Sequence, residues 1–221
     1  QAENKTNAGT ATDTQVAYSE MTGEELDKIQ EDNKEKEKYL VIDVRPAEQY
    51  NEGHVKHAIN IPVDELNDRL AEIESYKDKD VVTVCNTGKK SSEAAQILVD
   101  NGFTKVANAQ GVKDFSYTTM TKAATVLGPK FNEMAKSGNY TIIDVRDEKD
   151  YNEGHIEGAL HTTADTYMDD IKSFPTDKPF LTYCYSGNRS WAVADELAKE
   201  GHEVYNAYDG TKEYDGYELV K

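Results

Sequence analysis

The chain has 221 residues, of which 37% are hydrophobic and 30% are charged, and its formal net charge at pH 7 is −17. This composition is typical of a soluble globular protein, and no apolar run approaches the roughly 20 residues needed to span a bilayer. The negative charge argues against nucleic acid as a partner, because a phosphate backbone requires stripes of Lys and Arg. Two cysteines are too few for a fold held together by disulfides.

The first residues are small and polar and show no hydrophobic periodicity, so we expect residues 1–17 to form a flexible tail. The sequence begins with Gln1 instead of Met. One hypothesis is that a signal peptide or lipid-anchor segment has been removed, which implies an exported or cell-envelope protein. The alternative is a chain shortened for expression, in which case a cytoplasmic location is expected.

Helices and short buried strands alternate in the next hundred residues. Thr22 and Glu25 form a capping box, which predicts a helix over residues 22–30. Apolar runs without alternation are typical of parallel strands buried on both faces. The pattern predicts strands over residues 39–45, 53–62, 81–84 and 105–107, a helical turn over 47–52, and helices over 64–76 and 91–100.

The same pattern then starts again. Residues 140–146 repeat residues 39–45, and residues 151–156 repeat residues 50–55, both at an offset of 101 (151 − 50). Cys184 repeats Cys85 at an offset of 99 (184 − 85), as residues 210–214 repeat residues 111–115. A repeat of this length is typical of a domain. We therefore expect two tandem α/β domains over residues 18–121 and 122–221, each a mainly parallel sheet flanked by helices.

Each copy places a cysteine between the end of a strand and the start of a helix. Backbone N–H groups and the positive end of the helix dipole favour thiolate over thiol at such a place. After Cys184 come Tyr185, Ser186, Gly187, Asn188, Arg189 and Ser190, and we expect Ser190 to open the helix. The N–H groups of this loop should surround the sulfur, Gly187 should adopt a positive φ, and Arg189 should bind an anion.

Cys85 begins a near copy of this loop, in which Gly88 corresponds to Gly187 and Lys90 corresponds to Arg189. A lysine supplies charge but lacks the planar fork of a guanidinium, so bidentate anion binding is lost. Cys184 is therefore the first candidate for a nucleophile, and Cys85 is the second.

In both halves of the chain these motifs resemble those of the rhodanese family. They are Asp-Val-Arg at a strand end, Tyr-Asn-Glu-Gly-His, a strand ending in Cys-x-x-Gly-x-(Arg/Lys), and Gly-x-x-x-aromatic. The resemblance implies two tandem rhodanese-like domains with sulfurtransferase activity. The cysteine would take a sulfane sulfur from a small anionic donor such as thiosulfate, become a persulfide, and pass the sulfur to a thiol or cyanide, or to a protein acceptor. Neither a metal nor another cofactor is implied.

Several alternatives stay open. Phosphatases of similar architecture need Cys-x5-Arg around a phosphate, whereas both loops here enclose four residues, so phosphatase activity is a minor hypothesis. A rhodanese fold could also act as a non-catalytic binding or sulfur-carrier module for a protein partner. The cysteines could be inert buried thiols. A disulfide between Cys85 and Cys184 is disfavoured, because each lies in its own domain.

The remaining motif residues have structural interpretations. We expect the Asp43–Arg45 and Asp144–Arg146 pairs to fix local structure by ion pairing. His54 and His155, which follow a glycine in each copy, are also interpreted as structural. His57 stands where the second copy has Gly158, so we expect the backbone to differ there.

Overall fold

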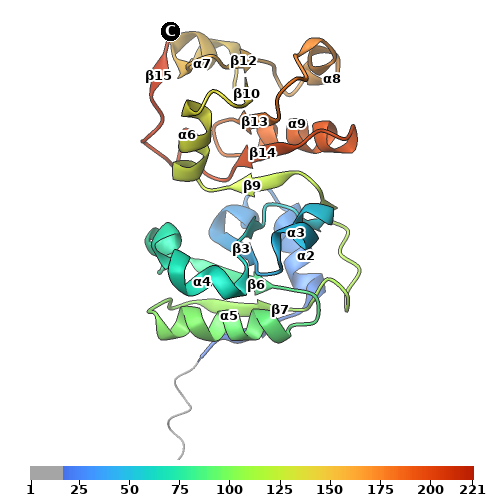
Figure 1. The fold of residues 1–221 in the computed structure, drawn as a ribbon, viewed down its shortest axis with the longest axis vertical. Helices are drawn as coiled ribbons and strands as arrows, with labels where there is room; N and C mark the ends of the chain where they lie inside the picture. The colour runs from blue at the N-terminus through green and yellow to red at the C-terminus, as the bar shows by residue number, and fades with distance from the viewer. Residues whose placement is uncertain (1–16) are drawn as a thin grey trace, which may run out of the picture. The chain divides into compact units, whose positions relative to one another are not determined.

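The computed structural model describes residues 17–221, which divide into two compact units between Met120 and Thr121 (Figure 1). Each unit contains a five-stranded parallel sheet flanked by helices. The expected α/β fold with two copies of one domain is therefore confirmed. Apart from Ala17, the tail expected over residues 1–17 lies outside the described residues.

The sheet of the first unit has five parallel strands. Their order is β2 (Ser19–Met21), β7 (Val106–Ala109), β6 (Asp80–Val84), β3 (Tyr39–Asp43) and β5 (Ile59–Asn60). The helices are α2 (Gly23–Glu31), α3 (Ala47–Glu52), α4 (Val63–Arg69) and α5 (Lys89–Asp100), with the 3-10 segments η1 (Glu35–Lys38) and η2 (Leu70–Tyr76). A small separate ladder pairs β4 (His54–Val55) with β8 (Met120–Thr121), where the unit ends.

The second unit repeats this strand order. Its parallel sheet consists of β9 (Ala124–Val126), β14 (Val204–Ala207), β13 (Phe180–Tyr183), β10 (Thr141–Asp144) and β12 (Leu160–His161). Its helices are α6 (Gly128–Lys136), α7 (Glu148–Glu153), α8 (Tyr167–Asp170) and α9 (Asn188–Lys199), with η3 (Ile171–Ser173). Here the small ladder is antiparallel and joins β11 (His155–Ile156) to β15 (Leu219–Val220).

Both faces of the second sheet pack against apolar side chains. Successive side chains of a strand point to opposite faces, so neighbouring residues of β13 belong to different clusters. Phe180 of β13 belongs to the buried cluster that includes Val193 of α9. Its neighbour Leu181 belongs to the other cluster, with Phe131 of α6. Figure 1 shows α6 and α9 on opposite sides of β13 and β14. The interpretation of continuous apolar runs as strands buried on both faces is therefore confirmed.

Some elements differ from the sequence-based expectation. The helix expected over residues 64–76 is α4 followed by η2, which is interrupted by the non-helical backbone of Ile73. The strand expected over residues 53–62 is two short strands, and only β5 joins the main sheet. The edge strands β2 and β9 and the helix α6 were not predicted. Three-residue edge strands are too short to show a hydrophobic period.

The expected backbone difference at His57 is wrong. His57 has a φ of 71° and Gly158 a φ of 85°, so both adopt the left-handed conformation. The turn requires this conformation, and histidine enters it more readily than a β-branched residue does. The side chain of His57 is buried. Burial, together with the charges of Lys36 and Lys56, holds its pKa well below the usual value and keeps the ring neutral.

Candidate active site

Both cysteines directly follow the central strand of their sheet. Cys85 comes after β6 and Cys184 after β13, the third of five strands in each order. The carboxyl ends of parallel strands meet at one edge, which is where α/β folds build ligand sites. Cys85 is 2% exposed and Cys184 is 0% exposed, so each sulfur lies at the floor of its loop.

The sulfur of Cys184 accepts hydrogen bonds from three donors. These are the N–H of Gly187 at 3.1 Å, the N–H of Ser190 at 3.4 Å and the hydroxyl of Ser190 at 3.2 Å. At Cys85 the N–H groups of Gly88 and Ser91 donate to the sulfur at 3.2 and 3.3 Å, and the thiol donates to the hydroxyl oxygen of Ser91 at 3.2 Å, a bond that reverses when the sulfur is a thiolate. Because a neutral thiol is a weak acceptor, this convergence suits a thiolate better than an inert thiol.

The helices that follow the cysteines begin two residues earlier than expected. Gly187 and Gly88 occupy the N-cap positions of α9 and α5, each with a φ of 89°, as expected for a glycine turn. Neither glycine has a side chain to cap the helix. The cysteine sulfur instead accepts the N–H groups of the N-cap and third helical residues, which otherwise lack intrahelical partners. Asn188, Arg189 and Lys90 therefore lie in the first helical turn and not in a loop.

The pKa of the Cys85 thiol is lowered from its usual value. Burial acts in the opposite direction and raises the pKa. The hydroxyl and N–H of Ser91, together with the N–H groups of Thr87 and Gly88, outweigh burial by stabilising the charged form. A lowered pKa is the electrostatic property that a sulfur nucleophile requires.

The other residues singled out in the second loop lie around its rim. Tyr185 is 50% exposed, and the Nζ atom of Lys212 lies 5.9 Å from the centre of its ring. Ser186 accepts a hydrogen bond from Asn188 at 3.4 Å. Arg189 makes an ion pair with Asp147 at 3.2 Å, a partner that the sequence did not reveal.

The rim of the first loop carries two cations. Lys89 and Lys90 are both exposed in the first turn of α5. Across residues 17–221, no carboxylate lies within ion-pair distance of either amine. In place of an ion pair, the loop has a hydrogen bond between the amides of Asn86 and Gln49, at 2.9 Å.

Gly111 and Gly210 lie directly against the backbone of the first and second cysteine loop. The N–H groups of Val112 and Thr211, which follow these glycines, donate to the carbonyl groups of Cys85 and Cys184 at 2.9 and 3.1 Å. A Cβ atom on Gly111 would lie 2.0 Å from the carbonyl oxygen of Asn86, and one on Gly210 would lie 2.1 Å from that of Tyr185. The repeated Gly-x-x-x-aromatic motif is visible in the sequence, but its contact with the cysteine loop is not.

Two asparagines and a serine were also missed. Asn108 of β7 donates to the carbonyl of Gly88 at 3.3 Å, and Asn206 of β14 donates to the carbonyl of Gly187 at 3.1 Å. These bonds tie the cysteine loop to the neighbouring strand. The signal for them is a buried amide repeated in an apolar strand, and the signal for Ser91 is its equivalence to Ser190.

The Asp-Val-Arg pairs have a structural role, as expected. Arg45 donates to both carboxylate oxygens of Asp43 at 2.7 to 3.1 Å and to the carbonyl of Gly53 at 2.7 Å. In the second unit Arg146 makes the equivalent bonds to Asp144 and Gly154. All of these side chains are buried, and their bonds hold the segment that follows each strand.

The histidines also have structural contacts. The rings of His54 and His155 stack on Tyr50 and Tyr151, with centroids 3.7 and 4.0 Å apart.

Both cysteines are free, so no disulfide joins them. Within residues 17–221 no group of three His, Cys, Asp or Glu side chains is placed to hold a metal ion. None of the helices in that range is both long and apolar enough to cross a membrane.

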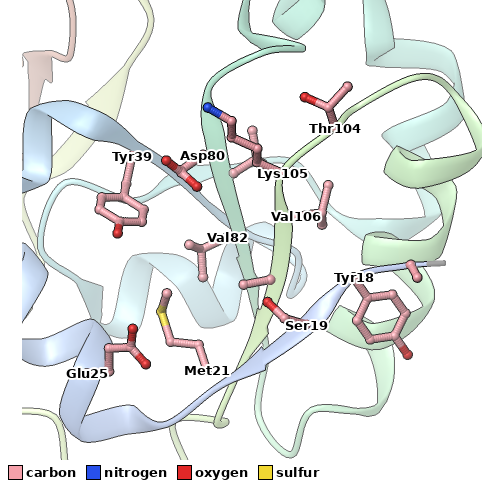
Figure 2. Close-up of a pocket in the computed structure, with 13 residues that line it drawn as sticks. Tyr18, Ser19, Met21, Glu25, Tyr39, Asp80, Val82, Thr104, Lys105 and Val106 are labelled. Carbon is pink, nitrogen blue, oxygen red and sulfur yellow. The ribbon is translucent and has the colours of Figure 1, made fainter. Parts of the chain in front are cut away.

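A pocket of about 460 Å³ in the first unit lies away from the cysteine loop (Figure 2). Tyr39 and Asp80, which line it, are the first residues of β3 and β6, and the edge strand β2 lines it as well. Cys85 follows the opposite end of β6. The pocket is therefore separate from the candidate active site.

Two stretches of the chain, residues 22–115 and 129–216, match the family described as the rhodanese-like domain. Each stretch contains one of the cysteine loops. The chain belongs to the rhodanese-like domain family. It therefore has two tandem rhodanese-like domains, as the motif resemblance implied.

The rhodanese-like chain is similar to proteins named thiosulfate sulfurtransferase. It is 45% identical over 75 residues to PspE of Escherichia coli, covering 34% of this chain and 72% of PspE. It is 38% identical over 79 residues to GlpE of Coxiella burnetii, covering 35% of this chain and 74% of GlpE. A solved rhodanese from E. coli, described with anions, is 42% identical, with a TM-score of 0.35 over 38% of this chain and 98% of that one.

Proposed function

We propose that this chain is a thiosulfate sulfurtransferase that carries sulfur as a cysteine persulfide. Similarity to PspE and GlpE supports sulfurtransferase activity in general. The observation that carries the specific proposal is the set of three hydrogen bonds at each cysteine sulfur at the start of a helix, two from backbone N–H groups and one shared with a serine hydroxyl. These donors stabilise a thiolate and would also stabilise a persulfide anion without a metal.

The reaction has two displacement steps. The cysteine thiolate attacks the outer sulfur of thiosulfate, the S–S bond of the donor breaks, and sulfite leaves with the bonding electron pair. Cyanide or a thiolate then attacks the outer sulfur of the persulfide, and the cysteine leaves as a thiolate. Neither step requires a general base, because each attacking group is an anion: the cysteine thiolate in the first step, and cyanide or a thiolate in the second.

The roles of the rim residues follow from their positions. Gly88, Gly187 and Ser190 donate to the sulfur. Arg189 and Lys90 supply positive charge for the anionic donor and the leaving sulfite. Tyr185, Ser186 and Asn188 form the rest of the rim of the second loop.

Thiocyanate formation from thiosulfate and cyanide tests this function. We expect Cys184→Ala and Cys85→Ala each to retain part of the activity, and the double variant to lose it. Circular dichroism should show that all three variants are folded. If the parent chain forms no thiocyanate, the chain is better described as a binding or sulfur-carrier module for a protein partner.

A further inference from the structure

The two cysteine loops share their hydrogen bonds but differ in charge. Lys89 and Lys90 give the first loop two positive charges with no ion-pair partner in the described part of the chain. The second loop has Arg189 alone, and Asp147 lies 3.2 Å from it. Glu20 lies beside the first loop, because its carboxylate and the carbonyl of Gly88 accept from the same amide of Asn108, each at 3.3 Å, and the second copy has Thr125 at the equivalent position. The local balance is therefore +1 (+2 − 1) at Cys85 and 0 (+1 − 1) at Cys184.

The residues next to the two loops also differ in charge. Gln49 contacts the first loop through Asn86, and the repeat places Asp150 at the equivalent position of the second copy (150 − 49 = 101). A lysine also contacts each loop through its backbone, and the Nζ atom of Lys212 lies 5.9 Å from the ring centre of Tyr185. The N–H of Lys113 donates to the carbonyl of Asn86 at 2.9 Å, and that of Lys212 donates to the carbonyl of Tyr185 at 3.0 Å.

The second loop also has an apolar rim that the first lacks. Tyr185 directly follows Cys184 and is 50% exposed, whereas the residue after Cys85 is the amide Asn86. An exposed aromatic ring next to a reactive sulfur suits an organic group, because it provides apolar area at little cost in side-chain entropy. A small doubly charged anion gains nothing from such a surface.

We propose that the two domains divide sulfur donors by charge and that Asp147 is the residue that determines this specificity. The Cys85 site takes the doubly charged inorganic donor, thiosulfate. The Cys184 site takes organic thiosulfonates, which carry a single charge and an apolar group. There the thiolate attacks the outer sulfur, the S–S bond breaks, and a sulfinate leaves with the electron pair. Asp147 acts through Arg189, whose charge it offsets. The proposal rests on the proposed sulfurtransferase function.

The test uses full-length chains with one cysteine each, and compares kcat/KM for thiosulfate with kcat/KM for benzenethiosulfonate, with cyanide as acceptor. The ratio of thiosulfate to benzenethiosulfonate should be higher in Cys184→Ala, which keeps Cys85, than in Cys85→Ala, which keeps Cys184. Added salt should lower the thiosulfate rate more at Cys85 than at Cys184, because screening weakens a net positive site more than a neutral one.

Asp147 and Pro46 occupy equivalent positions of the two copies. Exchanging the charge at these positions should reverse the difference in donor preference. In the Cys85→Ala chain, Asp147→Asn should raise kcat/KM for the doubly charged thiosulfate roughly three- to tenfold and that for the singly charged benzenethiosulfonate by a smaller factor, about two- to threefold. In the Cys184→Ala chain, Pro46→Asp should lower the thiosulfate value by a similar factor. Glu148→Gln is the control for Asp147→Asn, since it removes the same charge from the adjacent residue, for which the structure shows no contact with Arg189.

The outcomes separate the two proposals. Equal donor ratios at the two cysteines, or equal effects of Asp147→Asn and Glu148→Gln, would overturn the division of donors while leaving the sulfurtransferase function intact. Thiocyanate formed by neither single-cysteine chain from either donor would overturn the function itself.

Discussion

A single serine in each domain supplies two of the three hydrogen bonds to the cysteine sulfur. Ser190 donates its hydroxyl and its N–H to Cys184. Ser91 donates its N–H to Cys85, and its hydroxyl oxygen accepts from the Cys85 thiol and would donate to the thiolate. Both serines are buried, and both occupy the third helical position. At this position the backbone N–H at the start of the helix and the serine hydroxyl can both stabilise a thiolate.

Ser91→Ala should raise the pKa of Cys85. In the Cys184→Ala chain, the pH midpoint of alkylation by iodoacetamide should move upward by roughly one to two units, since a hydrogen bond to a charged group is worth about 1.5–3 kcal/mol. The thiolate exists above the pKa, so a higher pKa means slower alkylation at neutral pH.

Ser92→Ala provides the matched control for that measurement. Its hydroxyl donates to the carbonyl of Lys89 at 2.7 Å and does not contact the sulfur. The midpoint should not move in this variant. An unchanged midpoint in Ser91→Ala would contradict the assignment of the hydroxyl as a stabiliser of the thiolate.

Sequence reasoning found the cysteines because their chemistry is local: a strand, a thiol, a glycine and a helix follow one another in the chain. It could not assign Asp147, Asn206 or Gly210 to the site, because they lie 42, 19 and 25 residues from Arg189, Gly187 and Tyr185, the loop residues that they contact. It placed the helix start at Ser190, because nothing in the sequence showed that a cysteine sulfur would serve as the cap.

At the scale of elements, each cysteine loop is held between a helix and a glycine turn. Gly210 can approach the backbone of Tyr185 only because it has no Cβ. Gly210→Ala should therefore displace the Cys184 loop, and in the Cys85→Ala chain it should lower sulfur transfer at least tenfold while the far-ultraviolet circular dichroism stays unchanged. The measurement is thiocyanate formation from benzenethiosulfonate.

Gly201→Ala is the comparison for that variant. Gly201 has a φ of 94°, but a Cβ there would meet no atom within 4 Å. The substitution should cost stability through its backbone, about 1–2 kcal/mol, but should keep the activity. Equal loss of activity in both variants would mean that general destabilisation, and not the loop, is responsible.

The short edge strands could not be predicted from the sequence. The central strands are long apolar runs, so their type and order along the chain could be predicted. The edge strand β2 has only three residues, and its place beside β7 depends on pairing with residues 88 positions away (Glu20 with Asn108, 108 − 20). Such pairings are fixed by the tertiary fold, and a local pattern does not contain them.

At the scale of the whole molecule, each unit has what an independent domain needs. The second unit contains its own sheet, two buried clusters and a complete cysteine loop. A fragment of residues 121–221 should therefore fold alone, unfold cooperatively in urea, and keep the donor preference of the Cys184 site. A fragment that is unfolded, or folded without activity, would show that the site needs the first unit.

The central claim is that sulfur is carried on the two cysteines. Intact mass measured under denaturing, non-reducing conditions after incubation with thiosulfate and then benzenethiosulfonate tests it most directly. We expect up to two added sulfur atoms on the parent chain, at most one on Cys184→Ala and on Cys85→Ala, and none on the double variant, with every addition removed by cyanide. A parent chain that gains no sulfur, or a double variant that gains as much as the parent, would contradict it.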